Sequence, residues 1–333
     1  MGAEAAGARI EVFAPDGLPE IAAGADLAAL VARALPLVDG DIVVLTSKVV
    51  SKAEGRVRAA DEAGYLRALA EETDRVVAHR GPLRVVRHRL GLVLAAGGID
   101  RSNVSAGSIV LLPLDPDRSA SALRAALHER TGARVGVVIT DTAGRAWREG
   151  QTDIAIGVAG LLPAESFTGR VDQHGNTLSV TAPAVADQIA GAAELVQGKL
   201  GGRPLALVRG LAELVLPLEE DGPGAAALVR PAAGDLFGYG AREAVLAALA
   251  GEDADRVGFG ATATLEELSA GLARVLGAQV AVDTVGAAHE LLLSEAHHIP
   301  VVEAVCFSHG WRVEEWHTDR DSAVRARVSP VTA

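Results

Sequence analysis

The sequence predicts a mixed α/β protein with a larger domain over residues 1–238 and a smaller α/β domain over 239–333. Helical patterns alternate with short runs of branched apolar residues, which is typical of this class. Apolar residues make up 49% of the 333 residues and aromatic residues only 3%, so we expect a core of small side chains. A loop-like segment at 219–234, rich in Gly and Pro, separates the two patterns.

The first part of the chain begins with a helix and a strand. Asp26 is placed to cap a helix that continues to Leu35, and Pro36 follows its end. Asp39-Gly40 is a turn into a strand. From this strand onward we expect, in order, a strand at 41–45, a helix at 61–79, strands at 83–87, 91–96 and 108–112, a helix from Ser119 or Ser121 to Gly132, and a strand at 135–139.

The segment 143–180 is too long and too rich in Gly for an ordinary connection, which indicates a functional segment or short strands. Taken alone, this part of the chain favours an ordinary parallel sheet. The later expected elements are a helix from Thr181 to Gln197, a strand at 204–209, helices at 241–250, 264–277 and 285–297, and strands at 278–283, 300–307, 311–316 and 323–328, with a capping box at Thr264–Glu267.

Composition excludes several classes of partner. The net charge of −12 argues against a surface for nucleic acid, which needs clustered positive charge. The single cysteine, Cys306, leaves no intramolecular disulfide and fits a reducing compartment. Neither a signal peptide at the start nor an apolar run long enough for a membrane span is evident. We therefore expect a cytoplasmic protein that does not bind membranes.

Lysine is scarce, with three residues against twenty-eight arginines, and two of the three lie four positions apart, at Lys48 and Lys52. On a strand these two would share a face, where ammonium groups beside Ser47 and Ser51 would suit a polyphosphate. No P-loop pattern accompanies them. The alternatives are a solvated edge strand and a codon bias that left a few lysines by chance.

Acidic residues mark a second candidate site. Asp141 and Thr142 follow the expected strand at 135–139, and Asp100 lies in a Gly-rich loop. Carboxylate and hydroxyl oxygens suit hard cations such as Mg²⁺ or Mn²⁺, and two such ions can hold phosphate oxygens. The alternative is that both aspartates are ordinary turn and cap residues. Arg145 and Arg148 would either hold an anion there or belong to a charged loop anchored by Trp147.

Transition-metal and nucleophile signals are weak. Five of the nine histidines lie with Cys306 in the C-terminal part, but their spacing matches no zinc signature. No Gly-x-Ser-x-Gly elbow is present, and a lone cysteine is weak evidence for a nucleophile.

Several long motifs together resemble the coenzyme F420-0:L-glutamate ligase family, which includes the N-terminal half of the actinobacterial F420 biosynthesis protein. The resemblance covers residues 10–238. Its motifs are Gly17-Leu-Pro-Glu-Ile21, the run from Gly40 to Gly55, Gly98-Ile-Asp-Arg-Ser-Asn-Val104, Ile139-Thr-Asp-Thr-Ala-Gly-Arg-Ala-Trp-Arg148 and Gly150-Gln-Thr-Asp153.

The resemblance implies an intertwined, two-lobed α+β fold that is not doubly wound, in a homodimer. It implies a GTP-dependent amide ligation in which a carboxylate of F420-0 attacks the γ-phosphate of GTP. The amino group of L-glutamate then displaces phosphate from the acyl phosphate, giving a γ-glutamyl product, GDP and phosphate. Such a reaction needs charge neutralisation and alignment rather than an enzyme nucleophile.

Site roles follow from the resemblance position by position. Asp100, Asp141 and Thr142 are expected to bind two divalent ions, Mg²⁺ or Mn²⁺, and Asp141, Asp100 and Lys52 are the expected catalytic residues. The resemblance leaves open whether K⁺ is also required, and it gives Lys48 no role. The expected nucleotide contacts are Leu18, Pro19, Glu20, Ile21, Ser47, Lys52, Asn103 and Lys199.

The C-terminal part departs from the long family members, which carry a nitroreductase-like domain that binds FMN. Residues 239–333 are too few for that domain and lack its Arg-rich start, so we expect no FMN. A reduced remnant, an oligomerisation module and an unrelated domain remain open. Two alternatives to the ligase also remain: a metal-dependent GTP hydrolase or regulator, and a non-catalytic binder of F420 intermediates on the same scaffold.

Overall fold

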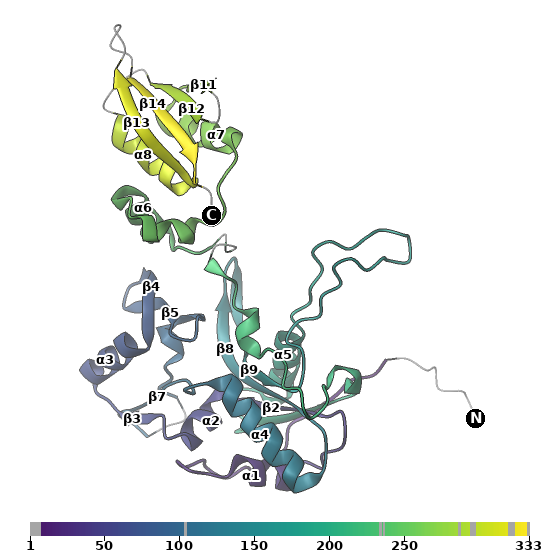
Figure 1. Cartoon of the computed structure of the whole chain (residues 1–333). Coiled ribbons are helices and arrows are strands. Elements are labelled where there is room, and N and C mark those ends of the chain that lie inside the picture. Colours follow the sequence, from purple (N-terminus) through teal and green to yellow (C-terminus); the bar gives the residue numbers. More distant parts are fainter. Residues whose placement is uncertain are drawn as a thin grey trace. The chain divides into compact units, whose positions relative to one another are not determined.

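A computed structural model describes residues 8–102, 105–232, 235, 237–285, 288–293, 298–318 and 324–331. The chain divides into two compact units, Met1–Val229 and Arg230–Ala333 (Figure 1). Both units contain helices and sheets, so the expected mixed α+β class is confirmed.

The first unit contains a central sheet of five strands in the order β1-β10-β2-β8-β9. Of the neighbouring pairs in this sheet, β2 and β8 are parallel and the other three are antiparallel. The expectation of an ordinary parallel sheet is therefore wrong. The strands β2 and β10 of this sheet are buried on both faces, as in parallel sheets, because helices cover both sides. The strands are β1 (Glu11–Phe13), β2 (Ile42–Thr46), β8 (Gly136–Arg145), β9 (Arg148–Ala159) and β10 (Leu205–Arg209).

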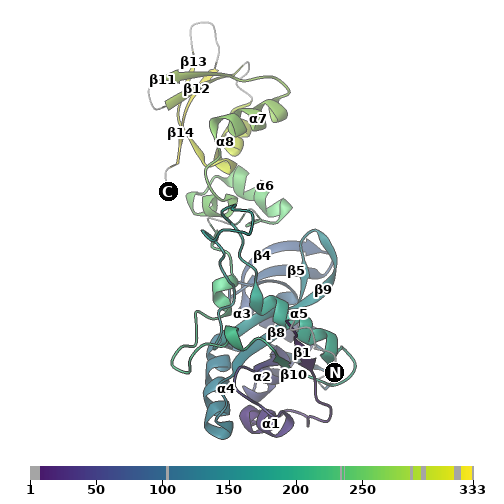
Figure 2. The ribbon, with the colours of Figure 1, turned by 90° about the vertical axis from the view of Figure 1, so that its right-hand side faces the viewer.

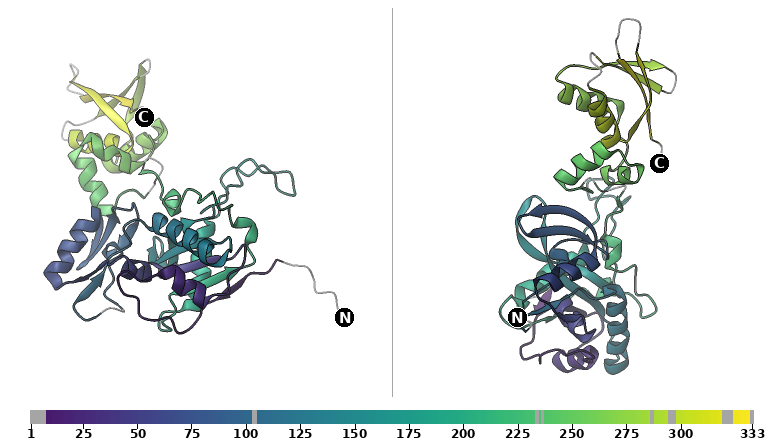
Figure 3. Two further views of the ribbon diagram at one scale, coloured as in Figure 1. Left: turned by 60° about the horizontal axis from the view of Figure 1, so that its bottom comes forward. Right: turned by 90° about the vertical axis from the view of Figure 1, so that its left-hand side faces the viewer.

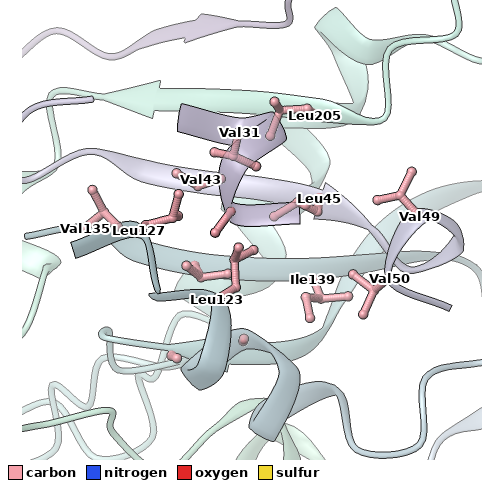
Figure 4. Close-up of a cluster of buried hydrophobic side chains, with 14 of the residues drawn as sticks. Val31, Val43, Leu45, Val49, Val50, Leu123, Leu127, Val135, Ile139 and Leu205 are labelled. Carbon is pink, nitrogen blue, oxygen red and sulfur yellow. The ribbon is translucent and has the colours of Figure 1, made fainter. Parts of the chain in front are cut away.

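Helices cover the two faces of this sheet (Figure 2). Successive side chains of a strand point to opposite faces. Val43 and Leu45 accordingly pack with α1 (Leu27–Ala34) and α4 (Pro116–Thr131), and Val44 packs with α5 on the other side. The α5 helix comprises Val185–Gln197. Figure 4 shows the first of these clusters, which includes Val31, Val43, Leu45, Val49, Val50, Leu123, Leu127, Val135, Ile139 and Leu205.

Local signals explain where these helices begin and end. Asp26 caps α1 as expected, accepting a hydrogen bond from the backbone of Ala29. The α4 helix begins earlier than expected, because Asp115 caps it and Pro116 occupies its first turn. It ends at Gly132 in the left-handed region, which glycine adopts without strain. The α5 helix begins four residues after the expected start at Thr181.

The short helix α2 (Ser47–Ala53) replaces the strand that we expected around the two lysines. Val49 and Val50 disfavour a helix by propensity, but both are buried in the core, and this packing outweighs the small cost. The solvated edge strand is therefore wrong. Lys48 and Lys52 do share a side, because residues four apart are neighbours on a helix.

The segment that follows α2 and precedes α4 in the sequence forms a second lobe of the first unit (Figure 3). This lobe has a core of its own, with Leu69, Val86 and Ile109 among its buried residues. The expected helix at 61–79 ends at Glu72, because the branched residues after it pair with the next strand. The lobe contains β3 (Val57–Ala59), α3 (Glu62–Glu72), β4 (Thr73–Arg80), β5 (Leu83–His88), β6 (Val93–Ala95), the 3-10 turn Ala96–Gly98 and β7 (Ser108–Val110). This agrees with the two-lobed fold.

The second unit has one four-stranded antiparallel sheet, in the order β11-β12-β14-β13, packed around Leu268, Leu291 and Val302. The Thr264–Glu267 capping box is confirmed, with both reciprocal hydrogen bonds formed. Its elements are α6 (Ala241–Ala250), the 3-10 segment Asp253–Phe259, α7 (Leu265–Leu276), β11 (Ala281–Val285), β12 (Ala288–Leu293), α8 (Ile299–Ser308), β13 (Trp311–Thr318) and β14 (Val324–Pro330).

Two expectations for this second unit are wrong. The expected helix at 285–297 is the strand β12 over 288–293, and the expected strand at 300–307 is the helix α8. Short apolar runs do not distinguish a strand from a buried helix by periodicity. Pairing with β11 and β14 on either side decides β12, although its three consecutive leucines favour a helix locally.

Glu72 closes α3 with a buried charge cluster. The carboxylate is 5% exposed, and it accepts hydrogen bonds from Arg56 (2.7 Å) and Arg89 (2.9 Å) and lies 3.0 Å from Nε2 of His88. Burial by itself raises the pKa of Glu72, but the hydrogen bonds from His88, Arg56 and Arg89 outweigh it and lower the pKa to about 2.

We expect Glu72→Gln to lower the free energy of unfolding at pH 7 by about 3 kcal/mol. The folded pKa lies below the unfolded value, so the carboxylate stabilises the protein above about pH 4.5, and this is lost as the pH falls towards about 2. Urea unfolding followed by circular dichroism should show the two proteins converging at low pH. The control, Glu71→Gln, removes an exposed partner of Arg58 and should have little effect. A constant difference between pH 7 and pH 3 would contradict the cluster's role.

Candidate functional site

The parallel pairing of β2 and β8 brings two candidate residues together. Thr46 lies opposite Thr140, so the residues that follow, Ser47 and Asp141, meet at the same edge of the pair. The Ser47 hydroxyl donates a 3.1 Å hydrogen bond to Oδ1 of Asp141. The sequence indicated that Asp141 follows the end of a strand. In the structure β8 continues through Asp141 to Arg145 and forms a hairpin with β9. Asp141 is therefore not an ordinary turn residue.

Asp141 is held in an unfavourable electrostatic environment for a carboxylate. Burial raises its pKa, and the nearby charges of Asp153 and Asp100 add to this, while hydrogen bonds from Ser47 and the backbone of Thr142 lower it. The net result is a pKa of about 7. A positive charge at this position would relieve the repulsion between the three carboxylates.

Asp100 lies beside Asp141 but has its own counter-ion. Nζ of Lys48 is 2.6 Å from its Oδ2 and donates a hydrogen bond to the hydroxyl of Ser102 (2.9 Å). Burial alone raises the pKa of Asp100, but the hydrogen bonds from Lys48 and Ser102 lower it. Asp100 also accepts from the backbone of Ser102, so it caps a turn, as the alternative interpretation expected. No sequence pattern indicated this contact of Lys48.

Thr142 belongs to a different group of side chains, because neighbouring residues of a strand point to opposite faces. Its hydroxyl donates to Oδ1 of Asp153 on β9 (2.7 Å) and accepts from Lys199 (2.9 Å). Lys199 also contacts Asp153 at 3.2 Å and Glu194 at 2.5 Å. Sequence reasoning missed Asp153 and Glu194. The Gly150–Asp153 motif contained the signal, but only the pairing of β8 with β9 places Asp153 opposite Thr142.

Lys52 lies at the other end of α2, beside the segment that precedes α1. Its side chain is buried, its ammonium pairs with Glu20, and a cavity of about 260 Å³ lies next to both. Leu18 packs on the core, Pro19 is exposed and Ile21 is buried. The cavity is lined by Glu20, Ile21, Ala22, Ala23, Lys52, Gly55, Val57, Ser105 and Ser108. Asn103, another expected nucleotide contact, lies outside the described residues.

The tip of the β8–β9 hairpin does not match the expected charged loop. Trp147 is 87% exposed, and the pairing of the two strands holds the segment. Arg145 and Arg148 are exposed next to it, and Arg145 donates to the backbone oxygen of Glu149. Trp147 takes a positive φ of 63° at this tight turn.

The donor chemistry around Asp141 and Thr142 fits a hard divalent cation, since carboxylate and hydroxyl oxygens are its preferred ligands. Within the residues that the structure describes, no group of three or more His, Cys, Asp or Glu side chains is arranged to hold a metal ion. The charge of Asp153, the hydrogen-bond partner of Thr142, acts on Asp141 together with that of Asp100.

Cys306 does not have the properties of a nucleophile. It is 1% exposed in α8, and burial, together with the charge of Glu303, raises the pKa of its thiol to about 12. A thiol with this pKa holds its proton at neutral pH.

Comparison with known proteins identifies the family. A model of the F420-0:gamma-glutamyl ligase family matches residues 17–210. The coenzyme F420:L-glutamate ligase of Archaeoglobus fulgidus is 43% identical over 221 residues, covering 61% of this chain and 88% of that protein. The ligases of Halobacterium salinarum strain R1 and Methanothermobacter thermautotrophicus are 42% and 37% identical, covering 60% and 68% of this chain and 87% and 98% of their own lengths.

The chain therefore belongs to the F420-0:gamma-glutamyl ligase family, as its motifs indicated. The matched residues lie within the first unit. In the described part of the chain, no helix has the length and apolar character needed to span a bilayer.

We expect Asp141→Asn to stabilise the metal-free protein, and to do so more at high pH. The folded pKa of Asp141 lies above the unfolded value of 3.8, so its ionisation opposes folding increasingly as the pH rises towards about 7. The gain in unfolding free energy should be about 2 kcal/mol larger at pH 8 than at pH 5. Urea unfolding with a chelator present measures it. An equal gain at both pH values would show that the carboxylate is not strained.

Proposed function

We propose that this protein is a GTP-dependent ligase that joins the amino group of L-glutamate to a carboxyl group of coenzyme F420-0 through an amide bond and so builds the γ-glutamyl tail of coenzyme F420. One observation carries the proposal: α2 begins with Ser47 at the Asp141 carboxylate and ends near Lys52 at the cavity beside residues 18–21. A single rigid element therefore connects the expected metal residues with the expected nucleotide residues. The family and the names of the relatives agree with this activity.

The reaction proceeds in two displacements. A terminal carboxylate oxygen of F420-0 attacks the γ-phosphorus of GTP, and the bond to the β-phosphate oxygen breaks with release of GDP. The amino nitrogen of L-glutamate then attacks the acyl carbon, phosphate leaves with the bonding electrons, and the nitrogen loses its proton. No covalent bond to the protein forms, so alignment and charge neutralisation are the enzyme's contribution.

The chain's own residues supply these functions. Lys52 places an ammonium at the wall of the cavity, where it would neutralise phosphate oxygens, and residues 18–21 would contact the nucleotide. Asp100 and Asp141 would hold one divalent ion and Thr142 a second. When bound, Mg²⁺ or Mn²⁺ would neutralise the charge on the phosphate oxygens. Lys199 contacts Thr142 and two carboxylates, so its proposed role shifts from the nucleotide to the second ion.

The test is mass spectrometry of F420-0 incubated with the full chain, Mn²⁺, GTP and L-glutamate. We expect products heavier by one or more glutamyl units, formed together with GDP. GTP hydrolysis that needs neither glutamate nor F420-0 would favour the hydrolase instead. Tight binding of F420-0 without nucleotide consumption would favour the non-catalytic binder.

In the same assay, Lys52→Arg should lower kcat/KM at least about tenfold. The Lys52 side chain is 10% exposed, and the larger planar guanidinium cannot occupy the position of a compact ammonium there. The matched control replaces one cation by the other at an exposed site, Arg58→Lys, and should be neutral. A fully active Lys52→Arg enzyme would remove Lys52 from the phosphate site.

We propose in addition that the protein is a homodimer, and that an arm formed by residues 163–183 takes part in the contact. The arm projects from the first unit as two paired segments (Figure 1). Backbone hydrogen bonds from the N–H of Phe167 to the oxygen of Thr181 and from the N–H of Leu178 to the oxygen of Arg170 hold the two segments together. Val171 is 62% exposed and Val180 is 88% exposed. These apolar side chains would be removed from water if a second copy of the chain covered the arm.

Light scattering after size-exclusion chromatography should give the mass of a dimer for the wild type. Replacing Val171 and Val180 together by Asp should yield monomers, because charges would be buried at the contact. Val93→Asp, at a 52% exposed position of β6 in the second lobe, is the matched control and should remain dimeric. A monomeric wild type would refute the dimer, and dimeric arm variants would refute the role of the arm.

A further inference from the structure

We infer that Asp153 is a positioning residue that, with Lys199, orients the hydroxyl of Thr142 towards a bound divalent cation. The inference rests on the proposed function, in which Thr142 is a cation ligand. Asp153 lies directly opposite Thr142 in the antiparallel β8–β9 pair, and it is 4% exposed. Side chains opposite each other on a hairpin are close enough for direct contact, so the geometry does not depend on a mobile loop.

Both oxygens of the Asp153 carboxylate are engaged. Oδ1 accepts from the hydroxyl of Thr142 at 2.7 Å, and Oδ2 accepts from the hydroxyl of Thr140 at 3.1 Å. Lys199 reaches Oδ1 at 3.2 Å. The backbone N–H of Asp153 donates to Glu194 at 2.9 Å, which ties β9 to α5 at this residue. The carboxylate is therefore held in one orientation.

The hydrogen-bond inventory of Thr142 then determines where its hydrogen points. A hydroxyl has one hydrogen and two lone pairs, a carboxylate only accepts, and an ammonium only donates. Thr142 must therefore donate to Asp153 and accept from Lys199, which leaves one lone pair. With its hydrogen directed at Asp153, the hydroxyl presents this lone pair rather than a positive hydrogen to a cation. Without Asp153 the hydrogen is free to rotate.

Lys199 contributes the opposite charge that this arrangement needs. It contacts both Asp153 and Glu194, so the ammonium offsets the carboxylate that is buried close to Asp141. The Lys199 side chain is 56% exposed, whereas that of Asp153 is 5% exposed. Water can replace part of the contribution of Lys199 but not that of Asp153. We therefore expect Asp153 to have the larger effect.

The experiment is a double-mutant cycle on Mn²⁺ affinity, measured by electron paramagnetic resonance of the full chain without substrates. The Mn²⁺ ion whose binding is lost or weakened in Thr142→Val identifies the site to which Thr142 contributes. Asp153→Ala should weaken this site about ten- to a hundredfold, as the loss of a hydrogen-bond partner that orients a metal ligand does. In the Thr142→Val background the same change should cost little more, because the hydroxyl through which Asp153 acts is gone.

Two variants separate orientation from simple charge. Asp153→Asn keeps an accepting oxygen in the same place, so it should retain most of the affinity, whereas a pure charge effect would make it resemble Asp153→Ala. Asp187→Asn removes another carboxylate, on α5, which accepts a hydrogen bond from the backbone of Ala155, and it should leave the affinity unchanged. Thr142→Ser keeps the hydroxyl and should restore the dependence on Asp153.

Circular dichroism and thermal unfolding of each variant show whether it has folded. Should Asp153→Ala not fold, Lys199→Met takes its place in the cycle, with a smaller loss that again disappears in Thr142→Val. Equal losses in both backgrounds would overturn the inference. A wild type that binds Mn²⁺ and forms product but shows no coupling overturns this inference alone, whereas a wild type that binds no Mn²⁺ and forms no product overturns the proposed function as well.

Discussion

The parallel pairing of β2 and β8 is the constraint on which the rest of the first unit depends. Their side chains are buried on both faces, so helices must cover each side of the sheet. The aligned register places Ser47 and Asp141 at one edge, where β2 ends and β8 continues. Helix α2 starts at that edge, and Lys52 consequently lies a fixed distance from the Asp141 carboxylate along the helix. A shift of one residue would turn every one of these side chains to the opposite face.

The three lysines of the chain all lie beside carboxylates of the candidate site. Lys48 pairs with Asp100, Lys52 with Glu20, and Lys199 with Asp153 and Glu194. A compact ammonium can enter a small group of oxygens that a planar guanidinium cannot fill in the same way. The site thus combines an excess of carboxylates, which suits divalent cations, with ammonium groups that offset part of the negative charge.

Much of the helical structure could be predicted from the sequence, because caps and breakers act locally. Asp26 and Thr264 cap their helices as expected, and α6 has the expected bounds. The failures lie where pairing with a distant segment outweighs local preference. The helix expected at 61–79 becomes a strand after Glu72 because β5 pairs with it, and the valines of α2 form a helix because the core buries them.

The candidate site shows the same division. By itself the sequence determined which residue types were available and, through long motifs, the family: Asp100, Asp141, Thr142 and Lys52 could all be named in advance. Only the tertiary structure decided which of them meet. Thr142 and Asp141 point to opposite faces of β8. Asp153 and Glu194 belong to the candidate site, and Lys199 contacts Thr142 rather than the cavity beside Lys52. The physical reason is that strand pairing and register, which join residues far apart in the chain, are determined by long-range packing that no local pattern encodes.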